Sequence, residues 1–396
     1  MLVSRGGGGH KSAGDALLQI LGGSYDVEIN YVFEKILRPI DFLNILTKGH
    51  YTGEDLYNSL LKNHQKKLLQ LLVDSGKKAM SGQRVKRLFD KYLSQLPQLP
   101  DLIISPTPWI NHGAACSAHG FDIPFLIIPT DLDGSTFLNG FPDGATPLNC
   151  KIALSYDDPL IRETTLQNKQ FLEEQVLVTG FPVKPACSHK YSSQEKQQIR
   201  SSFNLFESHK TITLVMGAVG GNLIYNHVKS ILNLDPRLHG LHLEFNVCTG
   251  SNKAMSEKIC QLLHSQGARS LEHNAFILPS GLVVHVRGYV TNLIELMAVS
   301  DLIITKTGSC TVNEAIYLDK KLLLDNTERS TARYLTWEEF NVPFIEKYGL
   351  GLAFRDSRQL QMLIPSILKY PDKTKSTLER PPFEENLRAL IRSMID

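Results

Sequence analysis

Several features that would reveal a function directly are missing from this sequence. Its six cysteines include no C-x-x-C pair, and their spacing fits neither a zinc site nor a disulfide framework. No apolar run reaches the roughly 18 residues that span a bilayer, and no charged-then-apolar signal pattern opens the chain. The formal net charge of only +2 argues against a general attraction to polyanions. We therefore expect a cytoplasmic protein that binds no nucleic acid and contacts a membrane only peripherally.

What is present fits two globular domains with parallel sheets. The 396 residues can fill two cores, and 42% hydrophobic with 21% charged residues is typical of folded chains. Helical patterns separate apolar, β-rich runs, which predicts an α/β fold. These runs lie at residues 102–105, 125–129, 150–156, 175–179, 211–216 and 243–250. Two prolines in residues 180–185 interrupt regular structure, so we place the domain boundary between residues 182 and 183.

Residues 283–325 carry the clearest pattern, VVHVRGYVTNLIELMAVSDLIITKTGSCTVNEAIYLDKKLLLD. It predicts strand, helix, strand and helix, at residues 283–290, 292–299, 301–305 and from Thr311 onward. A Lys-Thr-Gly-Ser loop precedes the second helix. Because first-turn amides have no acceptor within their helix, the N–H groups of Gly308 and Ser309 would face an anion above the sheet.

Glu314 lies one turn inside that predicted helix and has two interpretations. Thr311 and Glu314 fit the S/T-x-x-E capping box, in which the carboxylate accepts from the Thr311 backbone N–H. Alternatively, Glu314 accepts hydrogen bonds from both hydroxyls of a nucleotide ribose at the carboxyl end of a parallel sheet. The local pattern leaves both interpretations open.

Four glycines, residues 6–9, precede His10 and a helix predicted over residues 12–21. Glycine permits positive φ and the close approach of a ligand, although a flexible tail is the ordinary explanation of such a run. The neutral imidazole of His10, with a usual pKa of about 6.5, can take a proton from a hydroxyl at physiological pH. The alternatives are that His10 only caps the helix or binds phosphate.

Residues 60–96 alternate leucines with cations. Arg84, Arg87 and Lys91 share one face of a predicted helix, and apolar residues recur on another face at helical spacing. Such a basic amphipathic helix either lies on anionic lipid or packs its apolar face on the first domain's sheet. Both interpretations stay open.

Three motifs together carry a family resemblance. They are GGGHKSAGDAL at residues 7–17, VRGYVTNLIELMAVSDLIITKTG at residues 286–308, and TVNEA at residues 311–315. They resemble glycosyltransferase family 28, most closely the monogalactosyldiacylglycerol synthases and the processive diacylglycerol glucosyltransferases. The resemblance implies the α/β GT-B fold, in which two Rossmann-like domains face a central cleft. It also implies inverting transfer of a hexose from a UDP-sugar to a lipid hydroxyl, that of diacylglycerol, to make a glycolipid.

The resemblance assigns roles to both domains. Residues 1–182 would face the acceptor and the cytoplasmic surface of an anionic membrane, residues 183–396 would bind the UDP-sugar, and the last helix would cross back onto the first domain. His10 and Asp131 would be catalytic. The donor would be bound by Gly220, Gly221, Asn222, Tyr289, Val290, Gly308, Ser309, Thr311, Glu314, Asn326 and Glu338. The acceptor or membrane would be contacted by Gly8, Gly9, Arg84, Arg87 and Lys91.

No metal and no cofactor are expected. Asp131 and Asp133 form a D-x-D tripeptide, which holds a divalent metal in another glycosyltransferase fold, but they follow a strand of the first domain, far along the chain from the donor motifs. A metal role is therefore disfavoured. Asp131 matches the T-D of the family and rivals His10 as the base.

Departures from the family pattern leave other functions open. Ser309-Cys310 replaces the common Pro-Gly, and Trp337 replaces a glutamine. The β-like run before the glycines of residues 6–9 is also shorter than in the family. The donor sugar therefore stays undecided between glucose and galactose. Two enzyme alternatives are a GT-B transferase for a prenyl-linked cell-wall intermediate and a UDP-sugar epimerase. A third alternative is a nucleotide-sugar-binding protein without catalysis.

Overall fold

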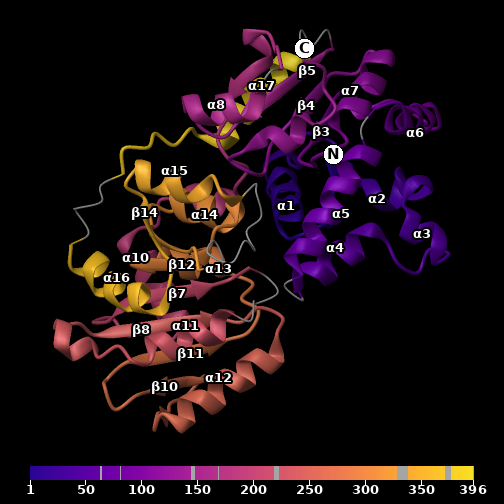
Figure 1. The fold of residues 1–396 in the computed structure, drawn as a ribbon. Helices are drawn as coiled ribbons and strands as arrows, with labels where there is room; N and C mark the ends of the chain where they lie inside the picture. The colour runs from indigo at the N-terminus through magenta and orange to yellow at the C-terminus, as the bar shows by residue number, and fades with distance from the viewer. Residues whose placement is uncertain are drawn as a thin grey trace. The chain divides into compact units, whose positions relative to one another are not determined.

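The computed structural model describes residues 1–62, 65–80, 82–143, 148–167, 169–217, 223–327, 338–370 and 376–395 (Figure 1). The chain divides into two compact units. Unit 1 comprises Met1–Pro185, Leu335–Glu338 and Glu379–Asp396, and unit 2 comprises Ala186–Tyr334 and Glu339–Leu378. The chain thus first leaves unit 1 near the predicted boundary, but two later segments return to it.

Unit 1 alternates short strands with helices along most of its length. Its elements are β1 (Leu2–Val3), α1 (Gly9–Leu21), β2 (Asn30–Tyr31), α2 (Val32–Lys35), η1 (Arg38–Ile40), α3 (Phe42–Leu46), α4 (Gly53–Lys62), α5 (Lys66–Ala79), α6 (Gln83–Ser94), β3 (Ile103–Ser105), α7 (Asn111–Gly120), β4 (Phe125–Ile127), η2 (Gly134–Leu138), β5 (Cys150–Leu154), α8 (Pro159–Leu166), η3 (Glu173–Gln175), β6 (Val176–Val178) and α17 (Phe383–Ile395).

The sheet of unit 1 is parallel and covered on both faces. Strands β3, β4, β5 and β6 pair in that order, and β1 pairs with β2. Apolar side chains of α6 and α7 form a core with one face, and those of α1 and α17 form a core with the other. Burial on both faces explains why these strands appear in the sequence as uninterrupted apolar runs. Gly14 lets α1 approach β1, since a Cβ there would lie 2.9 Å from the Val3 side chain.

Unit 2 follows the predicted strand and helix pattern more fully. Its elements are α9 (Pro185–Ser188, which begins at the last residue of the first segment of unit 1), α10 (Ser193–Ser202), β7 (Lys210–Val215), α11 (Leu223–Ile231), η4 (Pro236–His239), β8 (Leu243–Cys248), α12 (Lys253–Ser265), β9 (Arg269–Ser270), β10 (Ala275–Ile277), β11 (Val283–Arg287), α13 (Leu293–Ala298), β12 (Leu302–Lys306), α14 (Ser309–Tyr317), β13 (Lys321–Asp325), α15 (Asn341–Lys347), β14 (Gly351–Phe354) and α16 (Ser357–Lys369).

The sheet of unit 2 has eight strands in the order β14-β13-β12-β7-β8-β11-β10-β9. All neighbours are parallel except β10, which runs antiparallel to both β11 and β9. Helices α11, α12 and α16 form a core with one face. The register sets Asp325 opposite both Lys306 and Phe354, so β12, β13 and β14 end at one edge. Loops at that carboxyl edge are where parallel α/β sheets bind ligands.

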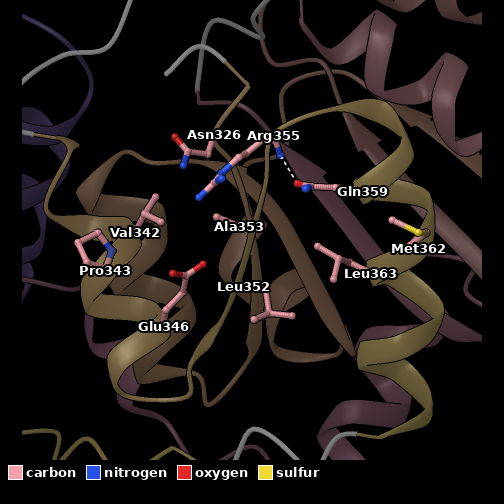
Figure 2. A pocket seen from close by; sticks show the side chains of 10 residues that line it. All are labelled: Asn326, Val342, Pro343, Glu346, Leu352, Ala353, Arg355, Gln359, Met362 and Leu363. Atoms are coloured by element: carbon pink, nitrogen blue, oxygen red, sulfur yellow. Dashed lines mark hydrogen bonds between the residues drawn. The ribbon is translucent and has the colours of Figure 1, made fainter. Parts of the chain in front are cut away.

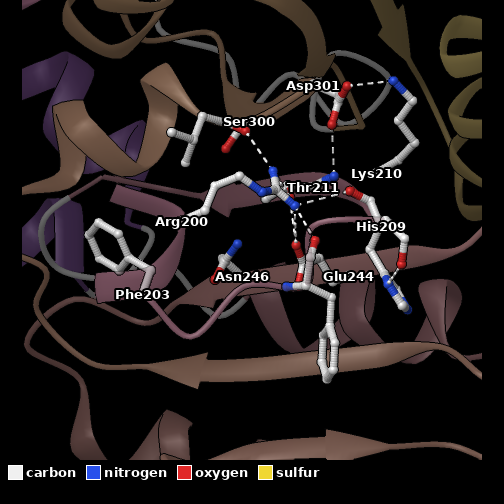
Figure 3. Close-up of polar contacts among 12 residues, drawn as sticks. Arg200, Phe203, His209, Lys210, Thr211, Glu244, Asn246, Ser300 and Asp301 are labelled. Carbon is white, nitrogen blue, oxygen red and sulfur yellow. Dashed lines mark hydrogen bonds and ion pairs between the residues drawn. The ribbon is translucent and has the colours of Figure 1, made fainter. Parts of the chain in front are cut away.

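The opposite, amino edge of this sheet holds a buried ionic network (Figure 3). The Glu244 carboxylate is fully buried and accepts hydrogen bonds from Arg200 Nη2 at 3.0 Å and Thr211 Oγ1 at 2.7 Å. Its other oxygen accepts from the Phe206 backbone N–H at 3.0 Å. These partners tie α10 and the loop after it to β7 and β8. The network stabilises the sheet at the edge opposite the candidate ligand loops.

Candidate functional site

His10 lies where three loops of unit 1 converge. It is the second residue of α1, just after the glycines. Its Nδ1 atom is 3.1 Å from the carbonyl oxygen of Pro106, which follows β3, and 2.9 Å from the hydroxyl oxygen of Thr130, which follows β4. The Phe137 ring packs against the imidazole in an edge-to-face arrangement, with the ring centroids 6.2 Å apart. The sequence signalled His10 and Thr130, but it gave no sign of Pro106.

These contacts define the protonation state of His10. A carbonyl oxygen can only accept, so the contact with Pro106 favours the tautomer with the proton on Nδ1, in which the Thr130 hydroxyl oxygen also accepts and the lone pair lies on Nε2. Burial lowers the pKa of His10 from 6.5 to about 4, and the bond to Pro106 offsets this shift only in part. The ring is therefore neutral at pH 7. Nε2, with no hydrogen-bond partner among the described residues, can accept a proton.

Asp131 and Glu338 belong to the same unit as His10. Burial raises the pKa of Tyr57, on α4, and the negative charges of Glu338 and Asp131 raise it further, which places both carboxylates near the phenol. Glu338 was expected in the donor domain, at residues 183–396, but it is grouped with unit 1. Local sequence pattern could not show this, because the chain around residue 338 otherwise belongs to unit 2. Tyr57 was not predicted.

Asp133 has a structural role at the turn before η2. Its Oδ1 accepts from the Ser135 backbone N–H at 2.9 Å and caps η2. Across the described residues, no group of three or more His, Cys, Asp or Glu side chains is placed to hold a metal ion. Asp133 of the D-x-D tripeptide thus stabilises the turn that opens η2.

The predicted acceptor glycines form the start of α1. Gly8 is the N-cap of this helix and Gly9 is its first residue. Gly7 has a φ of +70°, a left-handed conformation that favours glycine. The earlier expectation of a helix from residue 12 is corrected, because the helix already includes Gly9 and His10. The backbone thus turns at Gly7 and presents His10 on the first helical turn.

In unit 2, the described predicted donor residues follow the carboxyl ends of three parallel strands, of which β12 and β13 are neighbours in the sheet. Tyr289 and Val290 come after β11, and Tyr289 is 67% exposed. Gly308 follows β12, and Asn326 follows β13. Gly220, Gly221 and Asn222, like Trp337 in unit 1, lie outside the described residues.

Helix α14 begins earlier than predicted. Gly308 is its extended N-cap, Ser309 is its first residue and Thr311 its third. The T-x-x-E pattern of residues 311–314 therefore lies inside the helix and does not mark its start. The predicted capping box is therefore wrong: Thr311 is not the N-cap, and no side chain caps this helix. Glu314 keeps its ribose-binding interpretation as a prediction.

Asn341 secures the start of α14 and was not predicted. Its Nδ2 donates to the Thr307 carbonyl oxygen at 2.5 Å and contacts Ser309 Oγ at 3.2 Å. Asn313 Nδ2 also donates to the Ser309 carbonyl oxygen, at 2.8 Å. Asn341 is fully buried, so these bonds hold the loop between β12 and α14 in one conformation. Its only sequence signal was its place at the start of the tripeptide Asn-Val-Pro, residues 341–343.

A pocket of about 430 Å³ lies beside Asn326 (Figure 2). Arg355 and Glu346 supply its charges, and Leu352 and Leu363 part of its apolar wall. The full lining is Asn326, Val342, Pro343, Glu346, Leu352, Ala353, Arg355, Gln359, Met362 and Leu363. Asn326 is 2% exposed, and its Oδ1 has no hydrogen-bond partner among the described residues. The pocket suits a small molecule with both polar and apolar groups.

Helix α6 uses its apolar face inside unit 1. Val85, Phe89 and Leu93 are buried against the core that includes α7. Arg84, Arg87 and Lys91 are exposed on the other side. The packing interpretation therefore holds for the apolar face, and the three exposed cations are what the membrane interpretation of α6 still has. None of the described helices is long and apolar enough to span one.

The two Rossmann-like units, with their candidate residues at carboxyl strand ends, define an α/β protein of the GT-B class. The fold of a UDP-GlcNAc 2-epimerase from Neisseria meningitidis, solved with UDP-GlcNAc, matches with a TM-score of 0.55 at 15% identity, over 100% of this chain and 98% of that one. This likeness confirms the fold class.

Sequence comparisons confirm the family resemblance. Residues 242–333 match the glycosyltransferase family 28 C-terminal domain. The monogalactosyldiacylglycerol synthase of Spinacia oleracea is 24% identical over 91% of this chain and 64% of its own length. The UDP-N-acetylglucosamine--N-acetylmuramyl-(pentapeptide) pyrophosphoryl-undecaprenol N-acetylglucosamine transferase of Phocaeicola vulgatus is 27% identical over 61% of this chain and 54% of its own length. The chain thus spans less than two thirds of either relative.

Proposed function

We propose that this protein transfers a hexose from a UDP-sugar to the hydroxyl of diacylglycerol, with inversion at the anomeric carbon. The observation that carries the proposal is His10, whose Nδ1 is held by Pro106 so that a neutral Nε2 is ready to accept a proton. A transferase needs such a base to activate an acceptor hydroxyl. The family match in unit 2 supports the UDP-sugar as donor.

The proposed reaction is a single displacement. Nε2 of His10 takes the proton of the lipid hydroxyl while its oxygen attacks the anomeric carbon. The bond from that carbon to the β-phosphate oxygen breaks, and UDP leaves. Backbone amides of Gly308 and Ser309 at the start of α14 stabilise the charge on the diphosphate, so that no metal or cofactor is required. Glu314 binds the ribose, and Asn326 and Glu338 bind the sugar.

A lipid acceptor is supported by the surface of unit 1. Phe42, Ile45 and Leu46 on α3 are 71%, 59% and 66% exposed. Leu68 and Leu71 on α5 are 52% and 63% exposed. Exposed apolar side chains beside lysines and arginines suit the surface of an anionic bilayer, where each group adds to binding. We therefore propose peripheral attachment to the cytoplasmic face of a membrane through α3 and α5, with the cations of α6 assisting.

The test is product analysis with defined acceptors. The purified chain is incubated with radiolabelled UDP-glucose, UDP-galactose or UDP-N-acetylglucosamine, with vesicles that do or do not contain diacylglycerol. The proposal predicts label in a new lipid and UDP release that depends on diacylglycerol. Label transferred only to an undecaprenyl-pyrophosphoryl acceptor would instead support the cell-wall transferase. Interconversion of the UDP-sugars without acceptor would support an epimerase, and binding without turnover a non-catalytic protein.

A further inference from the structure

The backbone of the glycine loop, residues 4–8, is bound by the side chains of α4. Glu54 Oε1 accepts from the backbone N–H groups of Arg5 at 2.8 Å and Gly6 at 3.2 Å, and also from the Ser4 hydroxyl. Asn58 Oδ1 accepts from the Gly7 N–H at 2.8 Å. Three consecutive backbone amides are therefore hydrogen-bonded by two side chains about 50 residues away.

Asn58 also binds the loop in the other direction. Its Nδ2 donates to the Arg5 carbonyl oxygen at 3.1 Å, so the side-chain amide of Asn58 forms hydrogen bonds with both a donor and an acceptor of the loop backbone. Between the two polar contacts lies Tyr57, whose ring would be 3.6 Å from a Cβ on Gly6 and 3.7 Å from one on Gly7. Residues 54, 57 and 58 share one face of a helix by their spacing. This face of α4 therefore contacts the loop through all three side chains.

A glycine run has no conformation of its own. Glycine samples both signs of φ, so ordering several of them has a high cost in entropy that contacts must offset. Contacts from α4 supply that order, and Glu54 is only 8% exposed, which shields its hydrogen bonds from water. The loop ends at Gly8, the N-cap of α1, two residues before His10. The position of the His10 ring therefore depends on where α4 holds the loop.

We propose that Glu54 and Asn58 are positioning residues for His10, a role that rests on the function proposed above. They do not touch the reacting atoms. They fix the loop backbone so that Nδ1 of His10 meets Pro106 and Nε2 faces the acceptor.

Kinetics of single and double variants test this proposal. Because a misplacement of about 1 Å can cost on the order of 100-fold in rate, Asn58→Ala is expected to lower kcat by roughly 10- to 100-fold. The donor KM should change little. In a His10→Ala background the same change should have no further effect on kcat, since a positioning residue acts only through the base. An equal fall of kcat in both backgrounds would overturn the proposal.

Conservative and matched variants separate positioning from general damage. Glu54→Gln keeps an acceptor oxygen for Arg5 and Gly6 and should retain most activity, whereas Glu54→Ala should not. Gln175→Ala serves as control, because Gln175 Nε2 donates to the Leu148 and Cys150 carbonyls at a distance from the loop. If Gln175→Ala lowers kcat as much as Asn58→Ala, or if Glu54→Gln is no better than Glu54→Ala, the two residues only stabilise unit 1.

A readout without turnover keeps the proposal distinct from the proposed function. Hydrogen exchange of residues 5–9 should be at least about tenfold faster in Asn58→Ala than in the wild type, because the Gly7 amide loses its acceptor. Unchanged exchange would refute the proposed positioning by Glu54 and Asn58 even if transferase activity is found. Faster exchange in a chain without transferase activity would support the contacts of Glu54 and Asn58 with the loop and would refute only the proposed transferase function. Glu54→Ala provides the same comparison if Asn58→Ala does not fold.

Discussion

Nε2 of His227 lies 2.8 Å from Oδ2 of Asp325, and both side chains are buried in unit 2. Burial alone would raise the pKa of Asp325, but the hydrogen bonds from His227 and Thr327 outweigh it and hold that pKa below its usual value. His227 is on α11, and Asp325 is the last residue of β13, directly before the candidate residue Asn326. The pair therefore joins a helix of the core to the candidate ligand edge of the sheet.

Replacing His227 should destabilise unit 2. In His227→Phe the buried Asp325 carboxylate loses a charge-assisted partner, at a cost of roughly 1–3 kcal/mol. His227→Gln is the matched variant, because it keeps an N–H donor and should lose less. Urea unfolding followed by circular dichroism measures both. Equal stability of the Phe variant and the wild type would show that the pair contributes nothing.

The base can be assigned by comparing His10→Ala with Asp131→Asn. Because proton transfer typically contributes about 10²- to 10⁴-fold, His10→Ala should lower kcat by that factor and leave the affinity for UDP nearly unchanged. Asp131→Asn should have the smaller effect. Initial rates and calorimetric titration with UDP give both quantities. Loss of kcat in Asp131→Asn alone would move the base to the carboxylate, and loss of UDP affinity in His10→Ala would place the imidazole on the diphosphate.

The buried imidazole should also make unit 1 sensitive to acid. Its pKa is about 4 in the folded protein and 6.5 in the reference state, so between these values the unfolded chain binds more protons. The stability that depends on a neutral His10 is present above pH 6.5 and is lost as the pH falls toward 4, by at most about 3 kcal/mol. His10→Gln should show a smaller loss over this window. Thermal unfolding of both proteins at pH 7 and pH 4.5 makes the comparison, and identical shifts would exclude His10 as the cause.

Glu314→Gln should weaken nucleotide binding without weakening α14. A charge-assisted hydrogen bond to ribose is worth about 1.5–3 kcal/mol, so the dissociation constant for UDP should rise at least tenfold. Thermal stability should stay near that of the wild type, because the structure has no capping box at this helix. Thr311→Ala is the control, because Thr311 would be the N-cap of the capping box that the structure does not show. A stability loss shared by both variants, with UDP affinity unchanged, would contradict the ribose role.

Vesicle sedimentation can separate apolar from ionic attachment. Replacing Phe42, Ile45 and Leu46 by serine should lower binding to neutral and anionic vesicles alike, by a factor of about 1000 or more, since each buried apolar side chain contributes roughly 1.5–3 kcal/mol. Reversing the cations of α6, Arg84, Arg87 and Lys91, to Glu should lower binding to anionic vesicles only. Leu238→Ser, at an exposed position of unit 2, should change neither. Unchanged sedimentation of both multiple variants would exclude these surfaces.

Patterns confined to short segments were predictable. Strand β12 and helix α13 could be placed within one or two residues, because uninterrupted apolar runs and helical spacing reflect burial on a parallel sheet. The start of α14 was predicted two residues late, since a T-x-x-E pattern also occurs inside helices. In α6 the sequence could not tell a lipid face from a core face, because both are apolar.

Contacts between distant segments were not predictable. Asn58 meets Gly7 across 51 residues, and neither residue belongs to a pattern that includes the other. Tyr57 and Glu338 are still further apart along the chain. Pro106 contributes only a backbone carbonyl, which any residue type has. Each of these contacts depends on the packing of whole elements, and a single sequence does not encode that packing in local periodicity.

Helix α17 reverses the usual order of assembly during synthesis. Its residues Leu387 and Leu390 complete the core over Leu17 and Ile20, so unit 1 needs a segment that follows unit 2 in the chain. Domains generally fold in the order in which they leave the ribosome, with the N-terminal one first. Here unit 2 can finish while unit 1 still exposes the apolar side of α1. Unit 1 therefore cannot complete its core until α17, which follows unit 2 in the chain, has been synthesised.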